Sequence, residues 1–243
     1  MPTEALQKLP FQLCPLGDNA IVLQFGDKIE TSTHASIRAF TGILEDQPFK
    51  GLVEYVPAFT TLTIYYDPWV MSQEGKADAY SEVVQMLQQL LLNLEIKETP
   101  SSRVVELPVL YGSSFGPDLE EVSSFTNLTP EEVIHIHSNQ EYLVYMIGFA
   151  PGFPYLGGMD KRIATPRKAS PRQHIPAGSV GIAGEQTGVY PISTPGGWQL
   201  IGQTPLALFD ANRQVPSLLQ AGDRVRFVPI SESQFKERKE AQA

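Results

Sequence analysis

Two segments in the first hundred residues carry apolar side chains at the spacing of a helix. In residues 31–44 the apolar positions fall three and four apart, and in residues 77–94 they line one face while glutamate and glutamines fill the other. A stripe at this spacing is what the buried face of an amphipathic helix requires. We therefore predict one helix over each segment.

Strand patterns flank these helices. Residues 11–25 read as two short strands joined at Gly17-Asp18-Asn19, a group that tolerates the left-handed geometry of a tight turn. Residues 52–66 alternate in β-prone side chains and are interrupted at Pro57, which predicts two further strands. The order strand, strand, helix, strand, strand, helix predicts a small α+β domain over residues 1–100.

The pattern changes beyond a connector at residues 98–102. We predict short strands at residues 104–110, 142–149, 179–183, 199–201, 207–209 and 224–228. One helix interrupts them, because Thr129-Pro130-Glu131-Glu132 supplies an N-cap, a proline at the first helical position and a glutamate three residues past the cap. Many short strands with one helix predict a closed or nearly closed barrel over residues 101–232, followed by a flexible, charged tail at residues 233–243.

Composition narrows the class of protein. The 18 basic and 27 acidic residues give a net charge of −9, which is the wrong sign for binding nucleic acid. A hydrophobic share of 42% and a charged share of 19% suit a chain with a packed core. The one cysteine, Cys14, cannot form an internal disulfide, and no run of 18 apolar residues occurs. We expect a cytoplasmic protein that does not enter a membrane.

A local excess of positive charge stands out against this background. Residues 161–184 contain five basic and no acidic side chains, within a chain of net charge −9. Because arginine presents a planar fork of donors to carboxylate or phosphate oxygens, the segment indicates an anionic ligand or an acidic partner surface. Three prolines between residues 166 and 176 stiffen it, which lowers the entropy lost on binding. The alternative is a solvated loop face.

Several side chains near this segment are candidates for chemistry. His174 is the first candidate for proton transfer, and an ordinary hydrogen-bonded surface histidine is the alternative. Ser179 does not fit a nucleophile elbow, because a glycine precedes it by one residue where the motif needs two. Trp198 is either a barrel plug or a pocket wall. The small residues at 176–188 either expose backbone N–H groups to an oxyanion or serve tight barrel corners.

The sequence indicates no metal site. His135 and His137 lie two residues apart on the predicted helix, so their side chains point about 200° apart and cannot bind one ion. We expect them to stabilise the C-terminal end of that helix through its dipole.

A set of ordered motifs resembles a known family. The motifs are Gly148-Phe149-Ala150-Pro151-Gly152-Phe153-Pro154-Tyr155, Thr165-Pro166-Arg167, residues 176–184, Gln186-Thr187-Gly188-Val189-Tyr190-Pro191 and Pro195-Gly196-Gly197-Trp198-Gln199-Leu200-Ile201-Gly202. Together they resemble the bacterial family of 5-oxoprolinase B subunits, also called Kip inhibitor or allophanate hydrolase subunit 1. Supporting likeness at residues 16–18 and 115–121 extends the resemblance over the whole chain.

The resemblance implies a fold and an activity. It implies an N-terminal α+β domain followed by a cyclophilin-like β-barrel, although prolyl isomerase activity does not follow from that fold. It also implies a protein that works with a C-type partner of the same enzyme and, together with an A-type partner, opens 5-oxo-L-proline to L-glutamate at the expense of ATP. The sequence has no Walker-type phosphate loop, which leaves open whether ATP contacts this chain or only a partner.

Two alternatives accompany this prediction. Some family members inhibit a sporulation histidine kinase, in which case the basic segment would bind an acidic kinase surface. A weaker alternative is an accessory protein of an allophanate or urea pathway.

The resemblance and the basic segment together give a hypothesis for the site. In it, the 167–174 loop and the 186–190 turn line a cleft that binds a small carboxylate substrate or its phosphorylated form. His174 and Gln186 are the candidate catalytic residues. The candidate substrate-binding residues are Arg167, Lys168, Arg172, Ser179, Tyr190 and Gln199.

Overall fold

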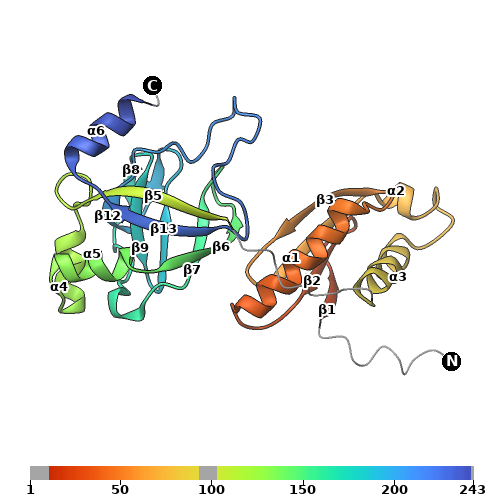
Figure 1. Ribbon diagram of the computed structural model, residues 1–243. Helices are drawn as coiled ribbons and strands as arrows, with labels where there is room; N and C mark the ends of the chain where they lie inside the picture. Colours follow the sequence, from red (N-terminus) through yellow and green to blue (C-terminus); the bar gives the residue numbers. More distant parts are fainter. Residues whose placement is uncertain (1–10, 93–102, 242–243) are drawn as a thin grey trace. The chain divides into compact units, whose positions relative to one another are not determined.

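The computed structural model describes residues 11–92 and 103–241 (Figure 1). The chain divides into two compact units, residues 1–100 and residues 101–243. The predicted connector at residues 98–102 lies outside the described residues. The first unit combines a sheet with helices, and the second is built around a closed barrel.

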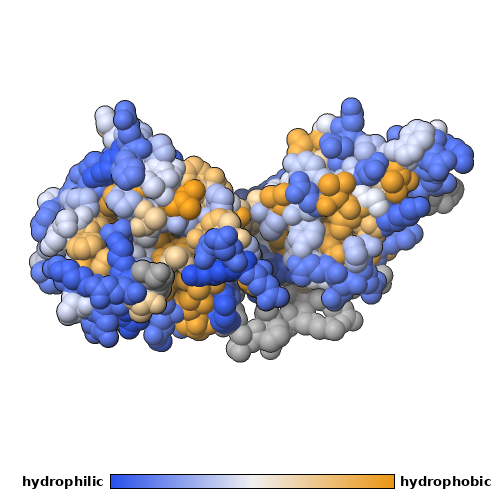
Figure 2. Space-filling view, turned by 90° about the horizontal axis from the view of Figure 1, so that it is seen from above, coloured by the Kyte–Doolittle hydropathy of each residue, from blue (hydrophilic) through white to orange (hydrophobic). Residues whose placement is uncertain are grey.

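The surface of both units is mixed in character. Figure 2 shows hydrophobic residues among mostly hydrophilic ones on the face in view. Large apolar side chains that are exposed include Val53 and Trp69 in the first unit and Phe125 and Phe149 in the second. Among the described residues, no helix combines the length and the apolar character that crossing a lipid bilayer requires.

A four-stranded antiparallel sheet forms the centre of the first unit, in the order β1-β2-β4-β3. Its strands are β1 (Gln12–Pro15), β2 (Ala20–Gln24), β3 (Leu52–Pro57) and β4 (Thr61–Tyr66). The predicted hairpin is confirmed, and its turn contains Gly17 at a φ of +64°. The two strands predicted in residues 52–66 are confirmed as well.

Within residues 11–92, three helices complete the first unit: α1 (Thr31–Asp46), α2 (Pro68–Met71) and α3 (Ala79–Leu92). Helices α1 and α3 confirm the two predicted from apolar spacing, and residues 93–94 of the second prediction lie outside the described residues. Phe40 of α1 and Leu87 of α3 are fully buried in one cluster with Ile21 and Ile64 of the sheet. Burial of these apolar faces stabilises the unit.

Seven strands close the barrel of the second unit, in the order β10-β7-β6-β13-β5-β12-β9. They are β5 (Val104–Tyr111), β6 (Glu141–Ile147), β7 (Pro154–Gly157), β9 (Ser179–Ala183), β10 (Gln186–Val189), β12 (Gln199–Gln203) and β13 (Arg224–Pro229). Strands β5 and β13 pair in parallel and the other pairs are antiparallel. The predicted closed barrel is confirmed, and it fits a cyclophilin-like fold.

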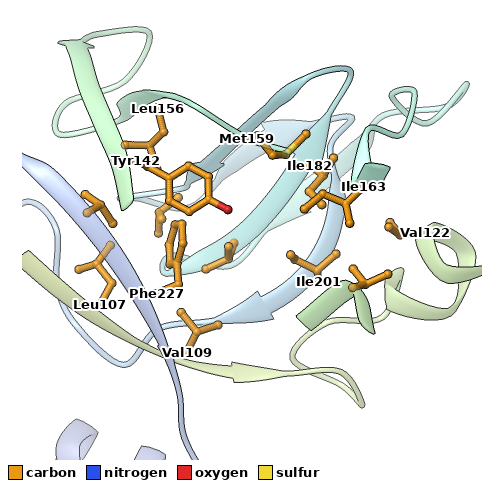
Figure 3. Close-up of a cluster of buried hydrophobic side chains, with 14 of the residues drawn as sticks. Leu107, Val109, Val122, Tyr142, Leu156, Met159, Ile163, Ile182, Ile201 and Phe227 are labelled. Atoms are coloured by element: carbon orange, nitrogen blue, oxygen red, sulfur yellow. The ribbon is translucent and has the colours of Figure 1, made fainter. Parts of the chain in front are cut away.

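Alternate side chains of these strands fill the barrel. Tyr142, Phe227, Leu107 and Ile182 are buried in one apolar cluster (Figure 3). Two further strands, β8 (Arg172–Ile175) and β11 (Thr194–Gly196), form a separate antiparallel pair.

The second unit holds more helix than the sequence predicted. Its helices are α4 (Leu119–Thr126), α5 (Pro130–Ser138), the 3-10 turn η2 (Lys161–Ile163) and α6 (Glu232–Glu240). The predicted capping box is confirmed at the start of α5, where Thr129 and Glu132 each accept a hydrogen bond from the other's backbone N–H. Helix α4 was not predicted, because its eight residues are too few to show a clear apolar repeat.

Two other segments differ from the sequence-based expectation. Residues 233–240, expected to belong to a flexible tail, lie in α6, because Ser231 caps the helix and Phe235 is buried. Residues 207–209 do not form a strand of the barrel. Instead Phe209 makes an isolated bridge with Ser217.

A buried histidine links α5 to the barrel. Nδ1 of His137 lies 2.8 Å from the Tyr111 hydroxyl, and Nε2 lies 2.8 Å from the Thr187 hydroxyl. Because the Thr187 hydroxyl donates to the Gly181 carbonyl, it accepts from Nε2–H, which assigns the proton of the neutral ring to Nε2. Burial lowers the pKa of His137 to about 3. The expectation that His137 acts as a cation on the helix dipole is therefore wrong.

This histidine makes the barrel sensitive to acid. The folded pKa is below the unfolded value of about 6.5, so its neutral form stabilises the fold above that pH and the stabilisation is lost as the pH falls toward 3. Between pH 6.5 and pH 4.5 we expect the wild type to lose about 2 kcal/mol more unfolding free energy than His137→Gln. Urea titration followed by Trp198 fluorescence in a Trp69→Phe background measures the difference.

The exposed His135 supplies the control. The His135→Gln variant should keep the acid dependence of the wild type. Parallel pH profiles for wild type and His137→Gln would contradict the assignment.

Candidate functional site

A pocket of about 350 Å³ opens on the barrel unit and is walled mainly by aromatic rings. The residues that line it are Phe149, Phe153, Tyr155, Arg167, Pro171, Tyr190, Pro195, Gly196, Gly197 and Trp198. They come from the β6–β7 turn, from β7, from the 165–171 loop, and from the segment between β10 and β12. The motifs quoted above for their resemblance therefore meet at one concave site.

Phe153 holds the aromatic walls together. Its ring makes edge-to-face contacts with those of Phe149, Tyr155, Tyr190 and Trp198, at centroid distances between 5.2 and 5.7 Å. Edge-to-face packing is the arrangement that aromatic quadrupoles favour. The predicted alternatives for Trp198 are thus resolved, because its largely buried ring is a pocket wall.

Glycines let these rings approach the barrel. A Cβ atom at Gly188 would lie 3.0 Å from Trp198 and 3.1 Å from Phe153, and one at Gly196 would lie 2.4 Å from the Tyr190 hydroxyl. Gly188 also pairs with Gly181 in the β9–β10 ladder. These contacts favour the packing role predicted for the glycines over the oxyanion role.

Arg167 supplies the positive charge of the pocket. Arg167 is exposed in the 165–171 loop and lines the pocket together with Tyr190. Among residues 11–92 and 103–241, no carboxylate forms an ion pair with Arg167. Its fork of donors is therefore available to an anion.

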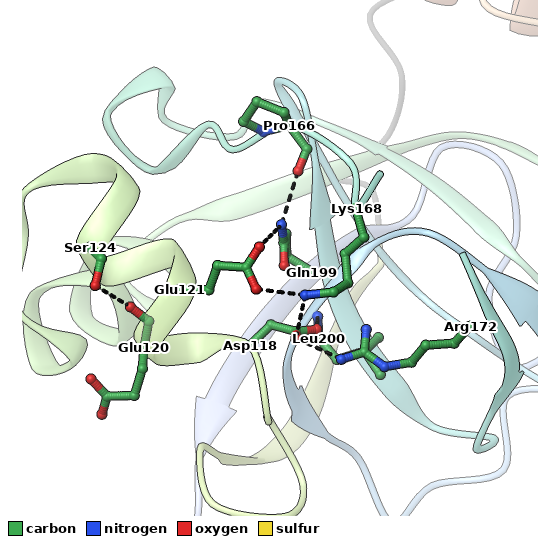
Figure 4. Close-up of polar contacts among 9 residues, drawn as sticks. All are labelled: Asp118, Glu120, Glu121, Ser124, Pro166, Lys168, Arg172, Gln199 and Leu200. Atoms are coloured by element: carbon green, nitrogen blue, oxygen red, sulfur yellow. Dashed lines mark hydrogen bonds and ion pairs between the residues drawn. The ribbon is translucent and has the colours of Figure 1, made fainter. Parts of the chain in front are cut away.

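Lys168 and Arg172 are both bound to Asp118 (Figure 4). Asp118 Oδ1 accepts hydrogen bonds from Arg172 Nη2 at 2.6 Å and from Lys168 Nζ at 3.1 Å. Asp118 Oδ2 accepts a hydrogen bond from the Leu200 backbone N–H at 2.7 Å. The side chain of Asp118 is only 4% exposed, so this carboxylate joins the loop to strand β12 at a buried point.

The electrostatics of Asp118 reflect this environment. Burial raises the pKa of its carboxyl group, but hydrogen bonds from Arg172, the Leu200 backbone and Lys168 outweigh burial and bring the pKa below its ordinary value. Asp118 is therefore ionised at neutral pH. Lys168 and Arg172 stabilise this carboxylate in the folded chain. Their predicted role in binding a substrate therefore requires a ligand that competes with Asp118.

Glu121 extends the same network. Its Oε2 lies 2.5 Å from Lys168 Nζ, and its Oε1 accepts a hydrogen bond from Gln199 Nε2 at 3.0 Å. Gln199 Nε2 also donates to the Pro166 carbonyl, so the amide holds the loop from beneath. Gln199 is 3% exposed and belongs to this hydrogen-bond network. Trp198, the residue before it on the chain, lines the pocket.

The other predicted site residues have different positions. His174 is exposed on β8, where Nδ1 lies 3.0 Å from the Ser193 hydroxyl, and it does not line the pocket. Gln186 starts β10 opposite Ala183 and does not line the pocket either. Ser179 is buried at the start of β9. Tyr190 does line the pocket, and burial raises the pKa of its hydroxyl despite the nearby Trp198 backbone and Arg167.

Two cations of the basic segment lie outside the site. Lys161 pairs with Glu185 at 3.3 Å and Arg162 pairs with Asp160 at 2.6 Å, and all four residues belong to the surface. Of the five positive charges that the sequence grouped together, Arg167 is thus the one that faces the pocket unpaired among the described residues. No group of three potential metal ligands occurs among those residues.

Sequence reasoning missed two sets of site residues. It gave no role to Asp118 and Glu121, because both precede the basic loop by about fifty positions and no local pattern joins them. It also gave none to Phe149, Phe153 and Tyr155, although their motif was part of the resemblance. The density of aromatic residues between glycines in residues 148–155 is the signal that pointed to them.

Comparison with known proteins gives consistent matches. The family model "Carboxyltransferase domain, subdomain C and D" matches residues 11–219. The chain is 53% identical to the B subunit of 5-oxoprolinase from Bacillus subtilis (strain 168), over 95% of this chain and 97% of that protein.

Solved structures agree with this similarity. A crystal structure of TTHA0988 matches with a TM-score of 0.75 and 37% identity over 87% of this chain, which spans 40% of the TTHA0988 chain. A crystal structure of PH0987 from Pyrococcus horikoshii matches with a TM-score of 0.55 and 44% identity, over 92% of this chain and all of that one.

The Asp118 network predicts a measurable effect on the loop. Asp118→Asn removes the charge that binds Arg172 and Lys168, and breaking such a buried pair should cost about 3 kcal/mol of unfolding free energy. The freed loop should also be cut faster by trypsin after Arg167 and Lys168. Urea titration and the rate of tryptic cleavage, located by mass spectrometry, measure the two effects.

Glu185→Gln is the matched control, because it removes a carboxylate from an exposed ion pair. We expect it to change stability by less than about 0.5 kcal/mol and to leave cleavage unchanged. Equal behaviour of the two variants would contradict the role of Asp118.

Proposed function

Since the chain belongs to the family of 5-oxoprolinase B subunits, we propose that it is the B subunit of a 5-oxoprolinase complex. In this proposal it acts with the A and C subunits to convert 5-oxo-L-proline to L-glutamate, with ATP hydrolysis, and it is active only as part of that complex. The observation that supports a direct role for this chain in holding the substrate is the aromatic pocket lined by Arg167.

The pocket suits the chemistry of 5-oxoproline. This molecule is a small lactam ring that carries one carboxylate. The pocket offers apolar ring faces and the guanidinium of Arg167, which has no carboxylate partner within residues 11–92 and 103–241. We propose that Arg167 holds the carboxylate through paired charge-assisted hydrogen bonds. The lactam ring then packs against Trp198 and Phe153, where water is excluded from its apolar carbons.

Tyr190 is suited to orient the reacting amide. A tyrosine hydroxyl is protonated at neutral pH and can donate a hydrogen bond, and burial raises the pKa of Tyr190 further above neutrality. A donor directed at the lactam carbonyl would stabilise the negative charge that develops there when the ring opens. The predicted catalytic roles of His174 and Gln186 have no comparable support, because neither side chain lines the pocket.

We propose that the ATP is bound by another protein of the complex. A triphosphate needs several unpaired cations or a glycine-rich phosphate loop. Lys168 and Arg172, which belong to the same basic segment as Arg167, are already bound to carboxylates. The pocket therefore matches a single small acid better than a nucleotide. The alternative of a histidine kinase inhibitor stays a prediction, and no observation on this chain favours it.

Arg167→Ala tests the proposal in the complex reconstituted with the A and C subunits. Loss of a charge-assisted pair should raise KM for 5-oxoproline by about 10- to 100-fold, and Arg167→Lys should recover part of the loss. The measurement is ATP hydrolysis that depends on 5-oxoproline, followed over a range of substrate concentrations.

Arg162→Ala is the control, because Arg162 is an exposed arginine outside the pocket. It should leave KM unchanged. An Arg167→Ala complex with the KM of the wild type would remove the proposed role of the pocket.

A further inference from the structure

The turn between β6 and β7 holds an aromatic side chain in an unusual backbone conformation. The Ala150 N–H donates to the Gly148 carbonyl at 2.8 Å, which closes a three-residue γ-turn around Phe149. Phe149 has a φ of +66°, which selects the rarer and strained form of this turn. Among the described non-glycine residues with positive φ, it is the only aromatic one. For a bulky side chain such a φ is a genuine outlier.

The surrounding contacts hold the turn in place. Gly148 N–H donates to the Phe153 carbonyl and Phe153 N–H donates to the Ala150 carbonyl, each at 3.0 Å. Gly152 has a φ of +81°, and a Cβ atom there would lie 2.8 Å from Phe209. The turn is therefore fixed from both ends, so the strained conformation at Phe149 persists.

Core packing does not explain this conformation. The Phe149 residue is 68% exposed, although burial of a phenylalanine is favourable. Its ring contact is with Phe153, edge to face, at a centroid distance of 5.5 Å. Without a ligand, a strained turn that exposes an apolar ring to water does not stabilise the fold. Strain of this kind is found at ligand clamps, where the ligand completes the packing.

The position of the Phe149 ring indicates which ligand would pack against it. Phe149 lines the same pocket as Arg167, Trp198 and Tyr190. A small ring-bearing acid whose carboxylate binds Arg167 would place apolar carbons within the aromatic wall that Phe149 extends. We infer that Phe149 is a clamp residue that covers the ring of the substrate and sets the size of acid that the pocket accepts. This inference rests on the proposed function.

Phe149→Gly separates the clamp from a structural role. The substitution removes the ring and also relieves the strained turn, because glycine adopts positive φ freely. In the complex with the A and C subunits, we expect KM for 5-oxoproline to rise by at least about tenfold with a much smaller change in kcat. The urea midpoint of the isolated chain should stay unchanged or rise.

Two further variants complete the test. Phe149→Tyr keeps the ring and should keep KM within about threefold of the wild type, because its added hydroxyl can remain in water. Phe125→Ala removes an exposed phenylalanine from α4, which does not line the pocket, and should leave KM unchanged.

The outcomes distinguish the clamp from the proposed function. An active wild-type complex whose Phe149→Gly variant keeps its KM would overturn the clamp alone. A fall in the urea midpoint as large as that of a core substitution would overturn it as well, because Phe149 would then serve the fold. A wild-type complex that does not turn over 5-oxoproline would overturn the proposed function and the clamp together.

Discussion

Asp118 lies almost fully buried at the start of α4 and binds Lys168 and Arg172, two cations that follow it by about fifty residues. An ionised carboxylate in such a position is tolerated only where hydrogen bonds and opposite charges replace its hydration. Arg172, Lys168 and the Leu200 backbone provide these partners. Asp118 and Glu121 thus pair with Lys168 and Arg172, whereas Arg167 faces the aromatic pocket.

The pocket depends on the same barrel strands that carry this network. Trp198 and Gln199 are adjacent on the chain, and the first lines the pocket while the second hydrogen-bonds to Glu121 and to the loop. Gly188 allows the Trp198 ring to lie against β10, whose Thr187 is bound from inside the barrel by His137. We expect a substitution at any of these residues to shift the aromatic side chains that line the pocket with Arg167. The site is thus a product of the barrel's packing together with the loop.

Much of the fold could be predicted from the sequence, because long elements repeat their apolar positions. The helices α1 and α3, the hairpin of β1 and β2, and the capping box of α5 follow from local patterns alone. Elements of three or four residues, such as β8 and β11, are too short to show a period. Of the candidate site residues, Arg167 and Tyr190 line the pocket, and their role in binding stays a prediction. A local sum of charges could not reveal that Asp118 pairs with Lys168 and Arg172. Contacts between residues far apart in sequence decide which cations are unpaired.

A crystal structure of this chain in complex with 5-oxoproline and its partner proteins tests the central claim most directly. The account predicts that the substrate carboxylate lies within hydrogen-bonding distance of the Arg167 guanidinium, while Arg172 and Lys168 keep their bonds to Asp118. A substrate whose carboxylate is bound by Arg172 or Lys168 with Asp118 displaced, or a substrate bound outside the aromatic pocket, would contradict it.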